Sequence, residues 1–377
     1  MYIEMIIILI LIIIIIYMYI NNINDTLIIS GGETKKKRFI ERIDSKFIDN
    51  NNPITVNNFN KFIDSYKGFN NKDITVLSWN ILDRKLGNIA NRILTDRKLK
   101  FNSKIYDWET RKSMIIKLLK HKPIDIICLQ EVPINYTKQN SLKIHGVDPN
   151  HVGEGTTSID PDFYDTFKNK YEIFFYSPFK SGTLTPSEAP DHIPVDGNVV
   201  MIALNRFEII RKHVHLLKNK KTCTILIVKD KNTNIIYNIM SVHLKVISVG
   251  IKNHQKKNVA KIQELIDYCY NDDILKVNPT IIAGDFNTLP SQMKVGQAKL
   301  LCSKEMEYPT ILNKMDGWIS VADYIMLVNP PTTDNKNIKC KYTDKYKVSV
   351  VDKESLLPTL TWPSDHIPVI ATIGKTK

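Results

Sequence analysis

An apolar run ends at a carboxylate and an amide two residues apart in residues 281–290, which read IIAGDFNTLP. Residues i and i+2 of a strand share a face, so Asp285 and Asn287 would emerge together where a buried strand opens into a loop. There a carboxylate can orient or deprotonate water, and an amide can donate to a phosphate oxygen. Because Gly-Asp also begins ordinary turns, this interpretation needs matching chemistry at other strand ends.

Polar groups do recur at the ends or edges of other strand-like runs, namely Asn80, Glu131, His243, Asp323, Asp365 and His366. Glu131 supplies the oxygen ligand that a hard divalent cation needs, and Asn80 could complete the start of such a site. Asp323 can hold His366 in one tautomer and favour its charged form. Each residue alone could cap a turn, form a surface ion pair or be a core histidine, but together they indicate phosphoryl chemistry.

The elements that would position these residues alternate along the chain. Strand-like runs over 74–79 and 124–129 flank a helical pattern over 108–120, which Pro123 ends. A second helix is expected over about 254–270, and polar residues 134–165 read as a long loop. Many strands with two clear helices predict a layered α/β or α+β domain.

The N-terminus predicts a membrane anchor. Residues 5–20 are uncharged and almost wholly apolar, and counting from Met1 the stretch reaches about the 20 residues that span a bilayer. No basic n-region or small-residue cleavage site is visible, which favours an uncleaved anchor over a signal peptide; a buried strand or helix is the alternative. The basic cluster 35–38 favours a cytosolic catalytic domain. We expect a single-pass membrane protein with an anchor at 1–21, a polar Asn/Lys-rich tether at 22–72 and a domain at 73–377.

The net charge and the cysteine content of the chain indicate the classes of partner and the redox compartment. The formal net charge of +13 favours anions such as nucleic acid, phosphorylated metabolites or an acidic membrane face. The five cysteines are odd in number, widely spaced and form no C-x-x-C pair. A disulfide scaffold and a zinc site are therefore disfavoured, and a reducing compartment fits better.

Six short blocks resemble the endonuclease/exonuclease/phosphatase superfamily, in the family's order: SWN at 78–80, CLQE at 128–131, SVHL at 241–244, GDFN at 284–287, ADY at 322–324 and SDH at 364–366. Finer details resemble its carbon-catabolite-repressor type deadenylase, nocturnin and angel branch. They are Trp108-x-x-Arg111-Lys112, Leu289-Pro290-Ser291, His243-Leu244-Lys245 and the stretch WPSDHIP at 362–368.

The resemblance implies a two-sheet α/β sandwich flanked by helices, here preceded by the N-terminal transmembrane helix. It implies Mg²⁺, or Mn²⁺, as cofactor, with Asn80, Glu131 and Asp365 on the metal side. Catalytic roles fall to His243, Asp285, Asn287, Asp323 and His366, and we assign substrate contacts to Asn198, His243, Lys245 and Asn287.

We predict a membrane-tethered, Mg²⁺-dependent phosphodiesterase that trims RNA from its 3′ end as a deadenylase does, with RNA favoured over DNA. One alternative is a phosphatase acting on a nucleotide cofactor or on a phosphoinositide- or sphingomyelin-type lipid headgroup. Another is an inactive binding scaffold, against which the intact set of polar strand-end residues argues.

Overall fold

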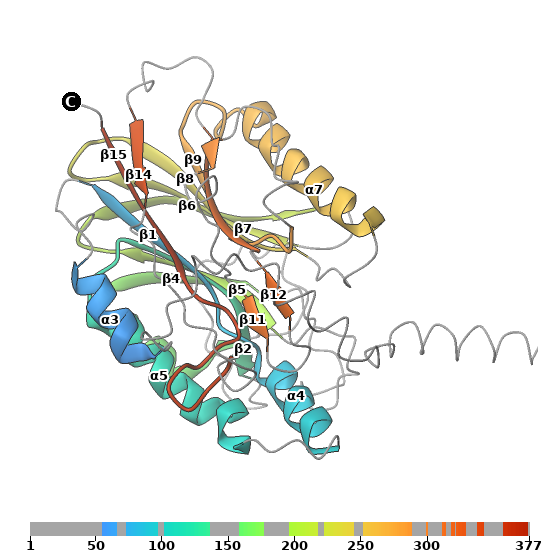
Figure 1. The fold of residues 1–377 in the computed structure, drawn as a ribbon. Helices are drawn as coiled ribbons and strands as arrows, with labels where there is room; N and C mark the ends of the chain where they lie inside the picture. Colours follow the sequence, from blue (N-terminus) through green and yellow to red (C-terminus); the bar gives the residue numbers. More distant parts are fainter. Residues whose placement is uncertain are drawn as a thin grey trace, which may run out of the picture. The chain divides into compact units, whose positions relative to one another are not determined.

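The computed structural model describes residues 55–65, 73–96, 102–135, 158–176, 196–217, 222–244, 252–288, 299–300, 311–313, 318–320, 322–328, 338–342 and 357–375. Within them, two mixed sheets stack face to face and helices cover their outer faces (Figure 1). The predicted two-sheet α/β sandwich is confirmed.

The first sheet has the strand order β14-β15-β1-β2-β5-β4, with β3 paired to β2. Its strands are β1 (Ile74–Asn80), β2 (Ile126–Asn135), β3 (Ser158–Ile159), β4 (Tyr171–Tyr176), β5 (Asp196–Ala203), β14 (Ile338–Tyr342) and β15 (Val369–Lys375). Strands β1 and β2 are parallel, and between them along the chain come α4 (Arg84–Asp96), a 3₁₀ turn η2 (Ser103–Tyr106) and α5 (Trp108–His121). The strand–helix–strand unit expected from the sequence is therefore a parallel one.

The second sheet has the order β10-β13-β9-β8-β7-β6. Its strands are β6 (Phe207–Leu216), β7 (Thr222–Asp230), β8 (Ile236–His243), β9 (Thr280–Asp285), β10 (Lys299–Leu300) and β13 (Asp323–Val328). The parallel pair β8 and β9 is connected through α7 (Lys252–Asn271), close to the helix predicted at 254–270. Outside the two sheets also lie α6 (Pro161–Phe167) and the antiparallel pair β11 (Ile311–Asn313) and β12 (Trp318–Ser320).

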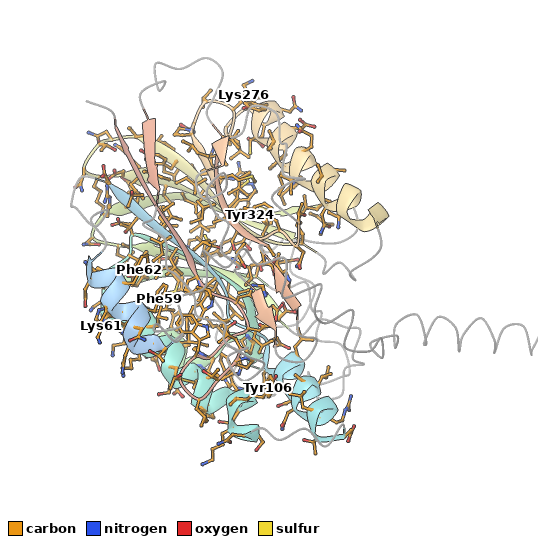
Figure 2. All side chains as sticks on the ribbon, viewed as in Figure 1. Phe59, Lys61, Phe62, Tyr106, Lys276 and Tyr324 are labelled. Atoms are coloured by element: carbon orange, nitrogen blue, oxygen red, sulfur yellow. The ribbon has the colours of Figure 1, made fainter. Side chains whose placement is uncertain are left out.

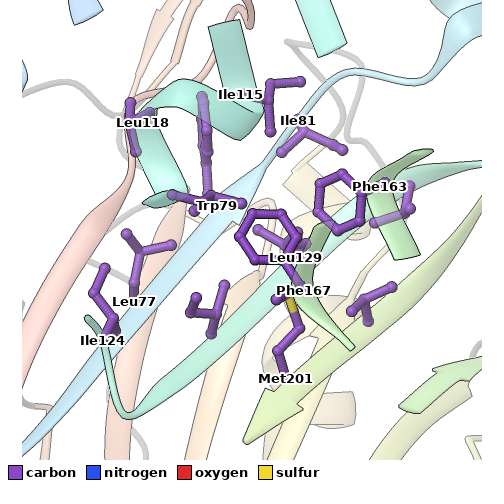
Figure 3. Close-up of a cluster of buried hydrophobic side chains, with 14 of the residues drawn as sticks. Leu77, Trp79, Ile81, Ile115, Leu118, Ile124, Leu129, Phe163, Phe167 and Met201 are labelled. Carbon is purple, nitrogen blue, oxygen red and sulfur yellow. The ribbon is translucent and has the colours of Figure 1, made fainter. Parts of the chain in front are cut away.

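The core consists of layers set by the alternation of side chains along each strand. In β1, Ile74 and Val76 pack between the sheets, whereas Leu77 and Trp79 face the layer beneath α5, shown in Figure 3. A third layer fills the space between the second sheet and α7. Central strands are buried on both faces, which explains why they read as continuous apolar runs in the sequence.

At one end of the sandwich, the buried guanidinium of Arg206 joins the two sheets. It donates to the Asp73 carbonyl at 2.7 Å and to the Asp125 carboxylate at 3.1 Å, both at the start of first-sheet strands. It also reaches the buried carboxylate of Asp230, at the end of β7, at 3.4 Å. We call these four residues the Arg206 clamp.

Helix α3 (Val56–Ser65) lies within the predicted tether at 22–72 and nevertheless packs on the first sheet. The Val56 amide donates to the Thr361 carbonyl at 3.0 Å, and Phe59 meets Trp362 edge-on with ring centroids 5.5 Å apart. The domain therefore draws part of its core from residues before 73, although the sequence there is rich in Asn and Lys.

The prediction of a single-pass membrane protein is wrong: no helix among the described residues is long and apolar enough to cross a bilayer. Even α7, with 20 residues, carries charged side chains along its length. Residues 1–21, where the anchor was predicted, and the basic cluster at 35–38 lie outside the described residues.

We expect Phe59→Ala to lower the free energy of unfolding by about 3–5 kcal/mol, because it removes a fully buried ring and leaves a cavity. Lys61→Ala on the outward face of the same helix should change it by less than about 0.5 kcal/mol (Figure 2). Urea unfolding followed by tryptophan fluorescence measures both. Equal effects of the two substitutions would mean that α3 does not contribute to the core.

Candidate active site

Strand register brings three of the predicted residues side by side. In the parallel pair β8–β9, His243 lies opposite Asp285, and in the antiparallel pair β9–β13, Asp323 lies opposite the same Asp285. A Cβ on Gly284 would overlap the carbonyl oxygen of Val242, so glycine lets β8 and β9 approach closely just before Asp285. One end of the second sheet thus carries two carboxylates and an imidazole.

The first sheet contributes Asn80 and Glu131. Asn80 ends β1 and lies beside Gln130, but β2 continues past Glu131 to Asn135, beyond the predicted strand end. The pairing of β2 with β5 shifts between Leu129 and Val132, and Glu131 has a φ of 56°. A non-glycine residue in this left-handed region carries strain, which is common where a side chain is aimed at a functional site.

The Asn80 carboxamide bridges the two sheets. Its nitrogen donates to Glu131 Oε1 at 2.8 Å and to Asp285 Oδ2 at 3.1 Å. Its oxygen accepts from the Leu82 amide at 3.0 Å, which fixes which end of the carboxamide faces the carboxylates. The Asp83 amide donates to the other Glu131 oxygen at 3.0 Å. The Glu131 carboxylate is therefore held from two directions.

His366 lies on the other side of Asp285. Its Nδ1 is 2.8 Å from Asp323 Oδ2, and its Nε2 is 3.8 Å from Asp285 Oδ2. Burial alone would lower the pKa of His366, but Asp323, with Asp365 and Asp285, raises that pKa well above the ordinary value. The imidazole is therefore a buried cation near neutral pH.

Backbone contacts fix the segment that carries His366. The indole N–H groups of Trp79 and Trp362 both donate to the His366 carbonyl at 3.0 Å. Ser364 donates its hydroxyl to the Asn80 carbonyl at 2.7 Å and accepts from the His366 amide at 3.1 Å. The two site-bearing segments of the first sheet are thereby tied together.

Asp285 is buried, and its pKa is raised by that burial and by the neighbouring Asp323, while His366, His243 and Asn80 oppose the rise. Its Oδ1 accepts from the Asn287 amide at 2.9 Å. Asn287 has a φ of 45° and donates its side-chain nitrogen to the Leu244 carbonyl at 3.0 Å. The Asp285 carboxylate is thus fixed in orientation and can accept a proton.

His243 lies among three carboxylates. Its Nε2 is 3.6 Å from Glu131 Oε1 and 3.8 Å from Asp285 Oδ2, and its Nδ1 is 3.8 Å from Asp196 Oδ2. Asp196 was not predicted, because it lies two residues after a proline and directly before a glycine, as loop residues do. The predicted Asn198 lies two residues later on β5, on the same face of the strand.

Next to the segment that follows Asn80 lies the fully buried guanidinium of Arg111. It donates to the carbonyls of Ile81 at 2.9 Å, Leu82 at 2.8 Å and Pro363 at 3.2 Å. Desolvation lowers its pKa to about 10, against the charges of Asp83, Asp365 and Glu131, so it stays protonated. The sequence singled out Arg111 within a motif but gave no indication of this role.

The structure therefore brings together most of the predicted residues: Asn80, Glu131, His243, Asp285, Asn287, Asp323 and His366 directly, and Asp365 through its charge on Arg111 and His366. Lys245 lies outside the described residues. Among those that are described, Asp285, Asp323 and His366 each place one ligand atom within 4.8 Å of the others, a group that could hold a metal ion.

Solved structures share this architecture. The human Nocturnin catalytic domain with bound sulfate matches with a TM-score of 0.53 and 19% identity, over 83% of this chain and 97% of that one. ANGEL2, described as a 2′,3′-cyclic phosphatase, matches in complex with adenosine-2′,3′-vanadate, with a TM-score of 0.52 and 15% identity, over 82% and 97%. An endonuclease/exonuclease/phosphatase family protein from Bacteroides thetaiotaomicron matches with a TM-score of 0.51 and 15% identity, over 80% and 97%.

The chain has the endonuclease/exonuclease/phosphatase fold. The resemblance read from six short blocks is thus confirmed at the level of the fold, whereas no protein-family model and no curated protein matches the sequence. In this endonuclease/exonuclease/phosphatase fold, the residues of those blocks meet at one end of the sandwich, opposite the Arg206 clamp.

Asp323→Asn should lower the pKa of His366, because it removes the countercharge that raises it. The folded protein binds this proton more tightly than the unfolded chain. The stabilisation is therefore complete below about pH 6.5 and is lost as the pH rises through the folded pKa. We expect the substitution to cost roughly 3–5 kcal/mol at pH 6 and less at higher pH.

NMR titration of the His366 imidazole in metal-free buffer measures the pKa, and a His366→Gln spectrum assigns the signal. Urea unfolding at a series of pH values measures the stability. The same His366 pKa in wild type and Asp323→Asn would contradict this account of the pair.

Proposed function

We propose that the protein is a divalent-metal-dependent phosphodiesterase that acts on the 3′ end of RNA. The observation that carries the proposal is the Asp285 carboxylate, which accepts a hydrogen bond from Asn80 of the other sheet and lies 3.8 Å from the His366 imidazole. A proton acceptor beside a buried cation is what hydrolysis of a phosphate ester requires.

The metal-side residues suit Mg²⁺. Glu131 and Asp365 offer carboxylate oxygens and no thiol, and Mg²⁺ commonly binds through one or two carboxylates together with substrate phosphate. Asn80 donates its side-chain nitrogen to Glu131 and would orient that carboxylate toward the ion. Three buried carboxylates, those of Asp83, Glu131 and Asp365, lie near one buried cation, the guanidinium of Arg111. The part of the site around Glu131 therefore carries an excess of negative charge. Bound Mg²⁺ or Mn²⁺ would supply positive charge to a phosphate oxygen there.

In the proposed reaction, a water oxygen forms a bond to phosphorus while the bond from phosphorus to the leaving ribose oxygen breaks. Asp285 accepts the proton of the attacking water, since its raised pKa is closer to that of a working base, and the leaving oxygen takes a proton from solvent. One N–H of the Asn287 carboxamide is donated to Leu244, and its second N–H serves a phosphate oxygen. His243, beside Glu131 and Asp285, donates to another oxygen.

His366 stabilises the negative charge that develops on the phosphoryl group. Its proton is held by Asp323, so it presents a fixed positive charge rather than a proton donor that titrates near neutral pH. Such preorganised charge in a buried site is worth about 10²–10³ in rate.

RNA is favoured as substrate on two grounds. The net charge of +13 suits a polyanion. ANGEL2, with the same fold, is described as a 2′,3′-cyclic phosphatase and is complexed with an adenosine-2′,3′-vanadate. That relative supports a second candidate, removal of a 2′,3′-cyclic phosphate from an RNA end, which the same residues could catalyse.

The full chain should be incubated with Mg²⁺ and, separately, poly(A) RNA ending in a 3′-hydroxyl, RNA ending in a 2′,3′-cyclic phosphate, duplex DNA, and NADP. Shortening of poly(A) supports the exonuclease, and ring opening without shortening supports the cyclic phosphatase. Turnover of NADP alone would overturn the RNA proposal. No turnover of any of these, with Asp285→Asn indistinguishable from wild type, would favour an inactive scaffold.

Asp285→Asn should lower kcat by about 10²–10⁴, because asparagine keeps the shape of the side chain but cannot accept the proton. Asp267→Asn on the exposed face of α7 makes the same chemical change away from the site and should leave kcat unchanged. Steady-state kinetics on the preferred substrate measures both. A loss confined to KM would contradict the assignment of Asp285 as the base.

Glu131→Gln should weaken Mg²⁺ binding by about ten-fold or more, since it removes a charged oxygen ligand. Isothermal titration with Mg²⁺ measures this without any substrate. Unchanged affinity would place the ion elsewhere, for instance at the group formed by Asp285, Asp323 and His366.

A further inference from the structure

Helix α7 presents a buried carboxamide to the backbone that carries the reactive side chains. Asn258 is 2% exposed, and its nitrogen donates to the carbonyls of Phe286 at 3.3 Å and Asn287 at 3.2 Å. These two carbonyls directly follow Asp285 in the chain. No feature of the sequence set Asn258 apart from the other polar residues of the helix.

A neighbouring cation fixes the orientation of this carboxamide. Lys261, one helical turn later and 7% exposed, donates its ammonium to the Asn258 oxygen at 3.3 Å. An ammonium group can only donate, so the atom that it contacts must be the amide oxygen. The amide nitrogen therefore faces the two carbonyls.

The backbone at this point needs support. Asn287 has a φ of 45°, a conformation that costs a non-glycine residue about 1–3 kcal/mol and persists only when its surroundings impose it. The backbone N–H of Asn287 donates to Asp285 Oδ1, and the side-chain nitrogen of Asn287 donates to the Leu244 carbonyl. Tyr324 donates its hydroxyl to the Thr288 carbonyl at 2.7 Å. Asn258 adds the bonds that hold the carbonyls of Phe286 and Asn287.

We propose that Asn258 is a positioning residue of the active site, which acts through Asn287 and Asp285 and does not touch the substrate. Its two hydrogen bonds hold residue 287 in the left-handed conformation, so that the Asn287 amide binds the Asp285 carboxylate. Lys261 keeps Asn258 in the orientation that allows this. The inference deepens the proposed function, because it depends on the catalytic roles given there to Asp285 and Asn287.

The decisive variant is Asn258→Asp. The new carboxylate has the same shape and retains its partner Lys261, but it cannot donate to a carbonyl. We expect kcat to fall by about 10–100-fold, as is typical for the loss of an outer partner, with KM changed by less than about two-fold. Asn271→Asp, the same change at an exposed position of α7, should leave both constants unchanged.

A double-mutant cycle distinguishes positioning from a general loss of structure. If Asn258 acts by positioning the Asp285 base, Asn258→Asp should cost less than about two-fold in kcat in an Asp285→Asn background, where that base is already lost. Equal fold-losses in both backgrounds would overturn the proposal. Lys261→Met provides a second variant should Asn258→Asp fail to fold. It should lower kcat as well, by a smaller factor. Wild-type kcat in Lys261→Met would then count against the proposal.

Hydrogen exchange tests the same inference without a substrate. In Asn258→Asp, the amide of Asn287 should exchange at least about ten-fold faster than in wild type, while amides in the core of β1 keep their wild-type rates. Unchanged exchange at residues 285–288 would overturn the positioning role. Faster exchange in a protein that turns over none of the substrates would leave Asn258 as the support of this backbone and refute only the proposed function.

Discussion

One carboxylate oxygen in the interior connects the two halves of the sandwich. Asp285 Oδ2 belongs to the second sheet, yet it accepts its hydrogen bond from Asn80 of the first and lies 3.8 Å from both His243 and His366. A buried carboxylate is costly unless polar partners surround it. The register of β8, β9 and β13, the glycine before Asp285 and the segment that carries His366 all supply those partners.

Charge is distributed unevenly around this oxygen. On one side, Asp323 holds a proton on His366, and the pair is compact and internally compensated. On the other, Asp83, Glu131 and Asp365 share one buried guanidinium, that of Arg111. The first side therefore balances its own charge, whereas the second has more carboxylates than cations.

The fold and most of the candidate site could be read from the sequence because several of its polar residues, such as Asn80, His243 and Asp285, lie at the ends of short apolar runs. Such runs are recognisable without tertiary information. Contacts between elements were not readable. Asp196 resembles a loop residue, Asn258 a surface position of a helix, and α3 part of a polar tether, since their roles depend on partners far away in the chain. The strand end expected at Glu131 is a bulge, because β5 continues to pair beyond it. Apolar length alone predicted an anchor that the helices of the described residues do not include.

The Arg206 clamp fixes the two sheets to each other at the end of the sandwich that is far from the candidate site. It joins Asp125 and Asp230 at one end of the sheets, and the reactive groups lie at the other, about 20 Å away along strands that rise about 3.3 Å per residue. Over that length, a tilt of about one degree between the sheets moves the strand tips by about 0.3 Å. Catalytic groups tolerate errors of only about 0.5 Å. Substitutions around Arg206, remote from the candidate site, are therefore a route by which the gap between Asn80 and Asp285 changes without any change at the site itself.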